Sequence, residues 1–208
     1  MKKVFNLLVV DESGSMNVIR RQALHGINET LRSIRDLQHK HPDVEQRVTL
    51  ITFDSNAIKT RYDNLGARQV KTLGWHDYRP NGCTPLYDAI GKGISMLNAY
   101  TSDEDNVLVT IITDGAENCS REYNLQMVKN LIGKLKKQNW TFTFIGTEGL
   151  DVEGMADSMG IDNHLEFRQD EQGTNEMFER ELQCRERYNR ELREEGPRRS
   201  HRYFREED

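Results

Sequence analysis

Three oxygen-bearing side chains follow a short apolar run near the start of the chain. Asp11, Ser13 and Ser15 occupy alternate positions directly after residues 4–10, which are almost continuously apolar. Such a run is typical of a buried parallel strand, and open α/β sheets bind their ligands at the carboxyl ends of strands. Hydroxyl and carboxylate oxygens without a neighbouring His or Cys suit Mg²⁺ or Mn²⁺ rather than zinc. The spacing therefore predicts a site for a hard divalent cation.

Two later segments can complete this cation site. Thr84 lies in the sequence Gly-Cys-Thr-Pro-Leu, and Asp114 lies in Thr-Asp-Gly after a second apolar run. The hydroxyls of Ser13, Ser15 and Thr84 are neutral ligands. Asp11 and Asp114 can then sit behind them, holding waters and orienting the hydroxyls. An ion with few direct carboxylates keeps much of its positive charge, so we expect it to bind a carboxylate supplied from outside the chain.

Short apolar runs and helical repeats alternate along most of the chain. Strands are predicted at residues 4–10, 48–53, 58–62, 107–112, 141–145 and 164–167. Helices are predicted at residues 18–38, 85–97, 125–135 and 152–159. The short gap before residues 58–62 indicates a hairpin, which makes that strand an antiparallel edge. The alternation predicts an α/β fold: a doubly wound, Rossmann-like sheet of six mostly parallel strands, with helices on both faces.

A charge-rich segment follows this alternation. Glu and Arg recur four residues apart with the acid first, which favours a helix whose charged face lies in water. The pairs are Glu176–Arg180, Glu181–Arg185 and Glu186–Arg190. A small coiled-coil contact or a docking segment is the alternative interpretation. The sequence thus divides into an α/β domain at residues 1–170, a charged C-terminal helix at 171–195 and a disordered tail at 196–208.

Composition and charge limit the classes of partner. The 208 residues carry a formal net charge of −5, and 36% of them are hydrophobic, which is enough for a core. A mildly acidic chain lacks the concentrated basic surface of nucleic-acid binders, and no apolar run is long enough to span a bilayer. The apolar start of the chain has no secretion-signal cleavage site. We expect a cytoplasmic protein that binds neither nucleic acid nor membrane.

The candidate ligands resemble the complete metal-ion-dependent adhesion site of the von Willebrand factor A (vWA) family. The matching residues, in the family's order, are Asp11, Ser13, Ser15, Thr84 and Asp114. The order of the predicted elements matches that family over residues 2–167. Residues 86–90 and 112–118 are further similar to the small stand-alone bacterial members.

The resemblance implies a role for each ligand and a function for the chain. The hydroxyls of Ser13 and Ser15 would bind the ion directly, and that of Thr84 directly or through water. Asp11 and Asp114 would act through water, and a Glu or Asp of an unknown partner protein would fill the last position. The implied function is a Mg²⁺-dependent protein-interaction module rather than an enzyme. Mn²⁺ or Ca²⁺ are the other candidate ions.

A Mg²⁺-dependent phosphoryl hydrolase of the haloacid-dehalogenase type is the alternative function. That class also places an Asp after the first strand of an α/β sheet. Its nucleophile motif needs a second Asp two residues later, where this chain has Ser13. The substitution disfavours the hydrolase, and we predict no catalytic residue.

Loops around the cation site are expected to form a rim that contacts the partner, because exposed loops and aromatic side chains often carry recognition. The predicted rim residues are Glu12, Trp75, His76, Tyr78, Cys83 and Glu117. Two of them have a second interpretation. Trp75 can pack its loop onto the body of the domain, and Glu117 can cap the helix that follows it.

The three cysteines do not suggest a disulfide framework. Cys83, Cys119 and Cys184 are odd in number, widely spaced and without a CxxC pair, which argues against both disulfides and a zinc site. Two unpaired small residues in loops are therefore expected at Cys83 and Cys119. A redox pair of these two cysteines near the cation site is the alternative.

The chain ends in acidic residues that can reach a cation site. A carboxylate of Glu206, Glu207 or Asp208 could bind the ion of the same chain or of a neighbour. The sequence therefore allows self-association through the charged helix or the tail.

Overall fold

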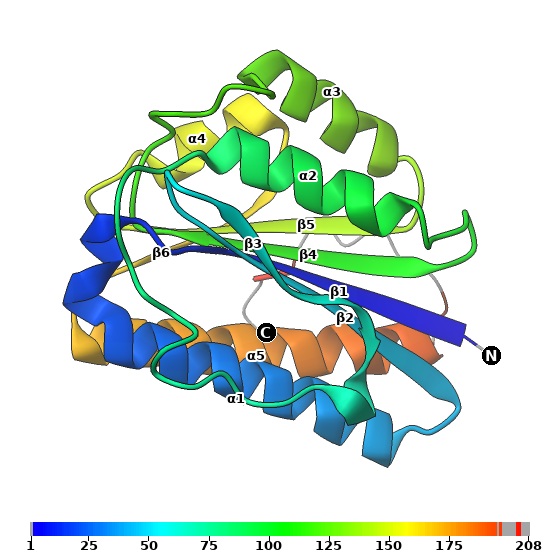
Figure 1. Cartoon of the computed structure of the whole chain (residues 1–208). Helices are drawn as coiled ribbons and strands as arrows, with labels where there is room; N and C mark the ends of the chain where they lie inside the picture. The colour runs from blue at the N-terminus through cyan, green and yellow to red at the C-terminus, as the bar shows by residue number, and fades with distance from the viewer. Residues whose placement is uncertain (1, 195, 197–202, 205–208) are drawn as a thin grey trace.

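The computed structural model describes residues 2–194, 196 and 203–204. Its centre is a six-stranded sheet with the order β3-β2-β1-β4-β5-β6 (Figure 1). The strands are β1 (Lys2–Asp11), β2 (Val44–Phe53), β3 (Ile58–Gly66), β4 (Asn106–Thr113), β5 (Trp140–Thr147) and β6 (Asn163–Phe167). Neighbouring strands run parallel except β2 and β3, which are antiparallel. The predicted doubly wound sheet with one antiparallel edge strand is confirmed.

Helices cover both faces of this sheet, as predicted (Figure 1). One face carries two long helices side by side, α1 (Arg20–Lys40) and α5 (Glu171–Glu194). The opposite face carries α2 (Leu86–Asn98), α3 (Leu125–Leu135) and α4 (Val152–Met159). Two short 3₁₀ helices complete the chain's regular structure, η1 (Gly14–Ile19) and η2 (Ala67–Gln69).

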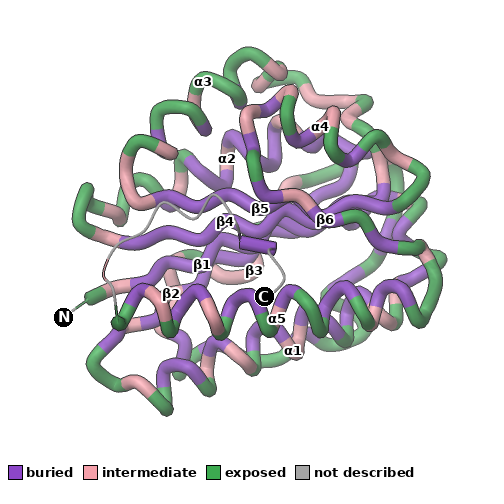
Figure 2. The backbone as a smooth tube through the Cα atoms, turned by 180° about the vertical axis from the view of Figure 1, so that it is seen from behind, coloured by how far each residue is buried: buried purple, intermediate pink, exposed green. Residues whose placement is uncertain are grey.

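Strand β1 supplies both layers of the core, because successive side chains of a strand point to opposite faces. Leu8 and Val10 pack with the α1 and α5 side chains, whereas Leu7 and Val9 pack with those of α2, α3 and α4. All four are at most 2% exposed. Figure 2 shows β1, β4 and β5 as a buried central layer between the two sets of helices, whereas the edge strand β3 is intermediate or exposed along its length. Packing from both sides fixes the position of each strand end.

Helix α5 differs from the solvated helix expected from its charges. Arg185 is fully buried and donates hydrogen bonds to Glu181 (2.6 Å), Asn6 (2.6 Å) and Thr110 (2.9 Å). Glu181 is 1% exposed. The solvated interpretation is wrong for this pair, because β1 and β4 each place a polar side chain beneath the helix. Arg180 and Glu186 are exposed, as expected.

The structure describes only part of the predicted C-terminal tail. Tyr203 and Phe204 are buried, and the Tyr203 hydroxyl donates a 3.1 Å hydrogen bond to Glu181. The acidic residues 206–208 lie outside the described residues, so their role at a cation site stays a prediction. In the part of the chain that the structure describes, no helix is both long and apolar enough to cross a membrane.

Candidate metal centre

The candidate site lies where the winding of the sheet changes direction. Asp11 ends β1, and Asp114 follows β4 directly. These strands are parallel neighbours, with Val10 beside Ile112. The connection from β1 runs through α1 on one face, and the connection from β4 runs through α3 on the other. Such a switch point is where open α/β sheets leave a crevice for ligands.

Hydrogen bonds join four of the predicted ligands into one chain. Asp11 Oδ1 accepts a 2.7 Å hydrogen bond from the backbone N–H of Ser13. The Ser13 and Ser15 hydroxyl oxygens are 3.2 Å apart. The Ser15 hydroxyl in turn donates to Asp114 Oδ1 at 2.7 Å. The structure therefore brings together side chains from the two strand ends.

Thr84 reaches the same place from the loop before α2. Its backbone N–H donates to Asn118 Oδ1 (2.8 Å), and the Asn118 N–H donates back to the Thr84 carbonyl (3.2 Å). The Thr84 hydroxyl lies over Gly115, where a Cβ atom would be 3.0 Å from it. The Gly14 N–H bonds the Gly82 carbonyl at 3.0 Å and holds this loop beside the serines. All five predicted ligands thus lie at one edge of the sheet.

The two aspartates of the site carry negative charge without a cationic partner among their hydrogen-bond donors. Burial raises the pKa of Asp11, and hydrogen bonds from Thr113 and Ser13 lower it. Burial is the larger effect, and the pKa is raised to about 6. Burial likewise raises the pKa of Asp114, which accepts hydrogen bonds from Ser15 and from the Gln169 amide. A bound cation would favour the ionised form of both carboxyls.

Glu12 lies between Asp11 and Ser13 in the sequence, and its pKa is lowered where those of the two aspartates are raised. Its buried carboxylate accepts from Lys59 (3.1 Å) and Arg61 (3.2 Å). Burial opposes ionisation, but hydrogen bonds from Thr52, the Arg79 N–H and Lys59 prevail and lower its pKa. Glu12 thus has cationic partners within the chain, whereas the hydrogen-bond donors to Asp11 and Asp114 among the described residues are uncharged.

The side chains of the site offer oxygen atoms, which are the ligands that Mg²⁺ prefers. The Ser13 and Ser15 hydroxyl oxygens lie 3.2 Å apart, and the Ser15 hydroxyl lies 2.7 Å from Asp114 Oδ1. Within the described residues no group of three or more His, Cys, Asp or Glu side chains is arranged to hold a metal. A metal here would rely on the hydroxyls.

The rim prediction is partly wrong. Glu12 and Tyr78 are fully buried and cannot contact a partner. The loop after η2 folds over the site, so Tyr78 donates its hydroxyl to the Asp11 carbonyl at 2.6 Å. Trp75 is 48% exposed and His76 is also exposed, as a rim requires. The Arg20 guanidinium lies 3.8 Å from the centre of the Trp75 ring and holds that side chain in place.

Cys83 and Glu117, the remaining rim residues, are half-buried and hold the loops together. Glu117 accepts hydrogen bonds from the Tyr87 N–H (2.9 Å) and from the N–H groups of Cys119 and Ser120 (2.8 and 2.7 Å). Cys83 forms a disulfide with Cys119. The expectation of unpaired cysteines is therefore wrong, because the fold brings two loops 36 residues apart in sequence into contact.

Residues that the sequence did not single out support the site from behind. Thr113 donates its hydroxyl to Asp11 Oδ2 at 2.5 Å, and Gln169, just before α5, donates to Asp114 Oδ2. Asp88 accepts hydrogen bonds from three backbone N–H groups at residues 121–123 (2.7–2.9 Å). Thr113 could have been found as the neighbour of Asp114. Gln169 and Asp88 carry no local signal for their contacts.

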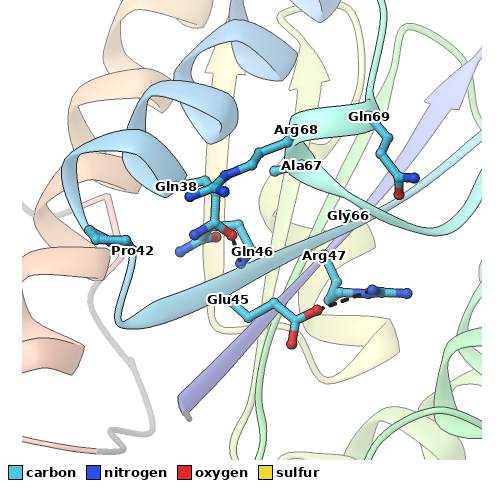
Figure 3. Close-up of a pocket in the computed structure, with 9 residues that line it drawn as sticks. All are labelled: Gln38, Pro42, Glu45, Gln46, Arg47, Gly66, Ala67, Arg68 and Gln69. Carbon is cyan, nitrogen blue, oxygen red and sulfur yellow. Dashed lines mark hydrogen bonds and ion pairs between the residues drawn. The ribbon is translucent and has the colours of Figure 1, made fainter.

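A pocket of about 380 Å³ lies at the opposite edge of the sheet, where β2 begins (Figure 3). Its polar lining is largely paired with itself. The Gln46 N–H donates to Gln38 Oε1 (2.8 Å), and Arg47 forms a 3.1 Å ion pair with Glu45. We assign it no function, and the site at the carboxyl ends of the strands is the stronger candidate.

Known structures resemble this fold, although no family model and no curated protein matches the chain. The VWA domain of SpRpn10 superposes with a TM-score of 0.58 over 87% of this chain and 94% of its own, at 13% identity. The vWF domain of the type V pili tip protein Mfa5 from Porphyromonas gingivalis gives 0.64 over 90% and 96%, at 9% identity. The chain has a vWA-like fold.

A third structure with this vWA-like fold is the open conformation of the pilus adhesin SpaC from Lactobacillus rhamnosus GG. It superposes with a TM-score of 0.67 over 88% of this chain at 16% identity. The chain spans 30% of the length of SpaC. At these identities the comparisons show the shared fold and not a shared function.

Proposed function

We propose that this vWA-like chain is a Mg²⁺-dependent protein-interaction module, whose ion captures a Glu or Asp side chain of a partner protein. The observation that carries the proposal is the chain of hydrogen bonds that gathers Asp11, Ser13, Ser15 and Asp114 at one edge of the sheet. Their side chains offer the oxygen ligands that Mg²⁺ prefers, and the two carboxylates accept hydrogen bonds from uncharged donors. Mn²⁺ or Ca²⁺ could replace Mg²⁺ in such an oxygen shell.

In this proposal Ser13, Ser15 and Thr84 supply hydroxyls to the ion, and Asp11 and Asp114 orient them and hold waters. Neutral hydroxyls leave the ion electrophilic, and a carboxylate from outside the chain then completes the shell. The ion supplies the positive charge that is missing among the described hydrogen-bond donors to Asp11 and Asp114.

Trp75 and His76 are the proposed rim contacts beside the ion. An exposed indole held by Arg20 is a rigid aromatic anchor, the kind of side chain that dominates many interfaces. Trp75→Ala is therefore expected to weaken partner binding while it leaves metal affinity unchanged.

The proposal includes no catalytic role. A haloacid-dehalogenase-type hydrolase needs an acid where Ser13 stands, and Ser13 instead pairs with Ser15. The similar solved structures include a pilus adhesin and a pilus tip protein. A phosphatase assay in Mg²⁺ separates the two functions, and turnover abolished by Asp11→Asn would favour the hydrolase. Cytoplasmic localisation and self-association stay predictions.

Parallel affinity captures test the partner-binding proposal. Wild type is used as bait in Mg²⁺ and in EDTA, with Thr84→Ala as the second bait. A protein retained by wild type in Mg²⁺, and lost with EDTA or Thr84→Ala, is the expected result. Identical captures under all conditions would contradict the metal bridge.

A further inference from the structure

The Cys83–Cys119 disulfide joins the two loops that carry the candidate ligands. Cys83 immediately precedes Thr84, and Cys119 lies five residues after Asp114. Thr84 is 3% exposed and Asp114 is 8% exposed, while both cysteines are only half-buried. The covalent tie therefore lies beside the site and within reach of solvent.

The loop that holds Cys119 has no helix or strand of its own. It runs from the end of β4 at Thr113 to the start of α3 at Leu125. Its far end is fixed by three hydrogen bonds to Asp88. Its near end, beside the site, depends on the disulfide, on Glu117 and on the exposed Asn118 that bonds Thr84.

We propose that the Cys83–Cys119 disulfide is redox-sensitive and sets the metal affinity of the site. We call this disulfide the pin. The inference rests on the proposed function, because it concerns the same ion. With the disulfide closed, the Thr84 hydroxyl is held over Gly115, beside Asp114. A ligand that is already in position loses less freedom when the ion binds, so the oxidised form binds more tightly.

Reduction opens this pin by ordinary thiol–disulfide exchange. A dithiol reductant transfers two electrons and two protons, which break the sulfur–sulfur bond and leave two thiols on the protein, while the reductant becomes a disulfide. The part of the loop around Cys119 then loses its covalent tie to Cys83 and keeps the hydrogen bonds of Glu117 and Asn118. Neither cysteine belongs to the two apolar core clusters, so reduction removes no side chain from the core packing.

Cys184 provides an internal control for this chemistry. It is a free thiol in α5, 4% exposed and packed in the core on the α1–α5 face. It is remote from both ligand loops in the fold. A reductant that acts through the pin must act equally when Cys184 is replaced.

Calorimetric titration of Mg²⁺ into oxidised and reduced full-length protein tests the proposal, with the reductant removed anaerobically. Thiol titration in denaturant should count one thiol before reduction and three after it. The expected result is binding about tenfold weaker after reduction, the scale of lost support around a metal ligand, and recovery on reoxidation. Cys83→Ser/Cys119→Ser should match the reduced protein and ignore reductant, and Cys184→Ser should respond like wild type.

Equal Mg²⁺ affinity before and after reduction would overturn the pin and leave the proposed function standing. Tight binding by the double serine variant would overturn it too. Loss of the folded state on reduction, seen by circular dichroism, would make the disulfide structural and the inference wrong. Absence of Mg²⁺ binding by the oxidised protein would overturn the proposed function together with the pin.

Discussion

Ser15 donates a 2.7 Å hydrogen bond to Asp114, 99 residues later in the chain. The two residues meet because β1 and β4 are parallel neighbours whose carboxyl ends share one edge of the sheet. Ser15 also lies 3.2 Å from the Ser13 hydroxyl, and the Ser13 N–H bonds Asp11. The two serines therefore link the acids of both strand ends, and their hydroxyls lie where a bound cation would need ligands.

Gly26→Ala is expected to destabilise the domain, because Phe178 of α5 packs directly on this glycine of α1. A Cβ at Gly26 would lie 2.0 Å from the Phe178 ring, and overpacking of this kind costs about 1–3 kcal/mol. Gly133→Ala in α3 is the matched control. A Cβ there meets no atom within 4 Å, so it should stabilise the helix by up to about 1 kcal/mol. Urea unfolding measures both, and a neutral Gly26→Ala would contradict the α1–α5 contact.

Arg185→Ala is expected to lower the free energy of unfolding by about 3–5 kcal/mol, since it leaves the Glu181 carboxylate buried without its partner. Replacing both charges, as Glu181→Leu with Arg185→Met, should recover only part of that loss, because it leaves no unpaired charge but removes buried hydrogen-bond partners of Asn6 and Tyr203. Denaturant unfolding measures the set, with the exposed Glu186→Ala as a control. Wild-type stability of Arg185→Ala would show that this side chain is not buried between α5 and the sheet.

The site was more predictable than the surface around it. Asp11 and Asp114 each follow an apolar run, and the alternation of elements predicts parallel strands whose carboxyl ends share one edge of the sheet. That the two strands are neighbours came from the structure. The burial of Glu12 and Tyr78 depends on how a long loop folds over the strand end, and no local spacing of residues predicts that. Glu181–Arg185 has the same spacing as its exposed neighbours, and only Asn6 and Thr110 beneath α5 make the difference. The disulfide likewise depends on contact between loops.

Asp88→Asn is expected to destabilise the protein by about 2 kcal/mol at neutral pH, because the carboxylate fixes the N–H groups of residues 121–123. Burial opposes ionisation of Asp88, but these hydrogen bonds prevail and lower its pKa below 3.8. A carboxyl whose pKa is lower in the folded state than in the unfolded state stabilises the fold at pH values above the unfolded-state pKa. That contribution is lost as the pH falls through the folded-state pKa. The difference from wild type should therefore shrink below about pH 4.

Urea unfolding across pH measures the Asp88 effect. Asp36→Asn, at an exposed position of α1, is the matched control and should stay within about 0.5 kcal/mol of wild type. A difference for Asp88→Asn that persists unchanged at low pH would show that the carboxylate charge is not what holds the loop.

The central claim, that the oxygens at this edge bind a divalent ion, is tested most directly by calorimetric titration of Mg²⁺ into three proteins. Wild type should bind one ion, and Thr84→Ser, which keeps the hydroxyl, should bind it with similar affinity. Thr84→Ala should bind it at least about tenfold more weakly while unfolding like wild type. No binding by wild type, or equal affinity for all three proteins, would contradict the account.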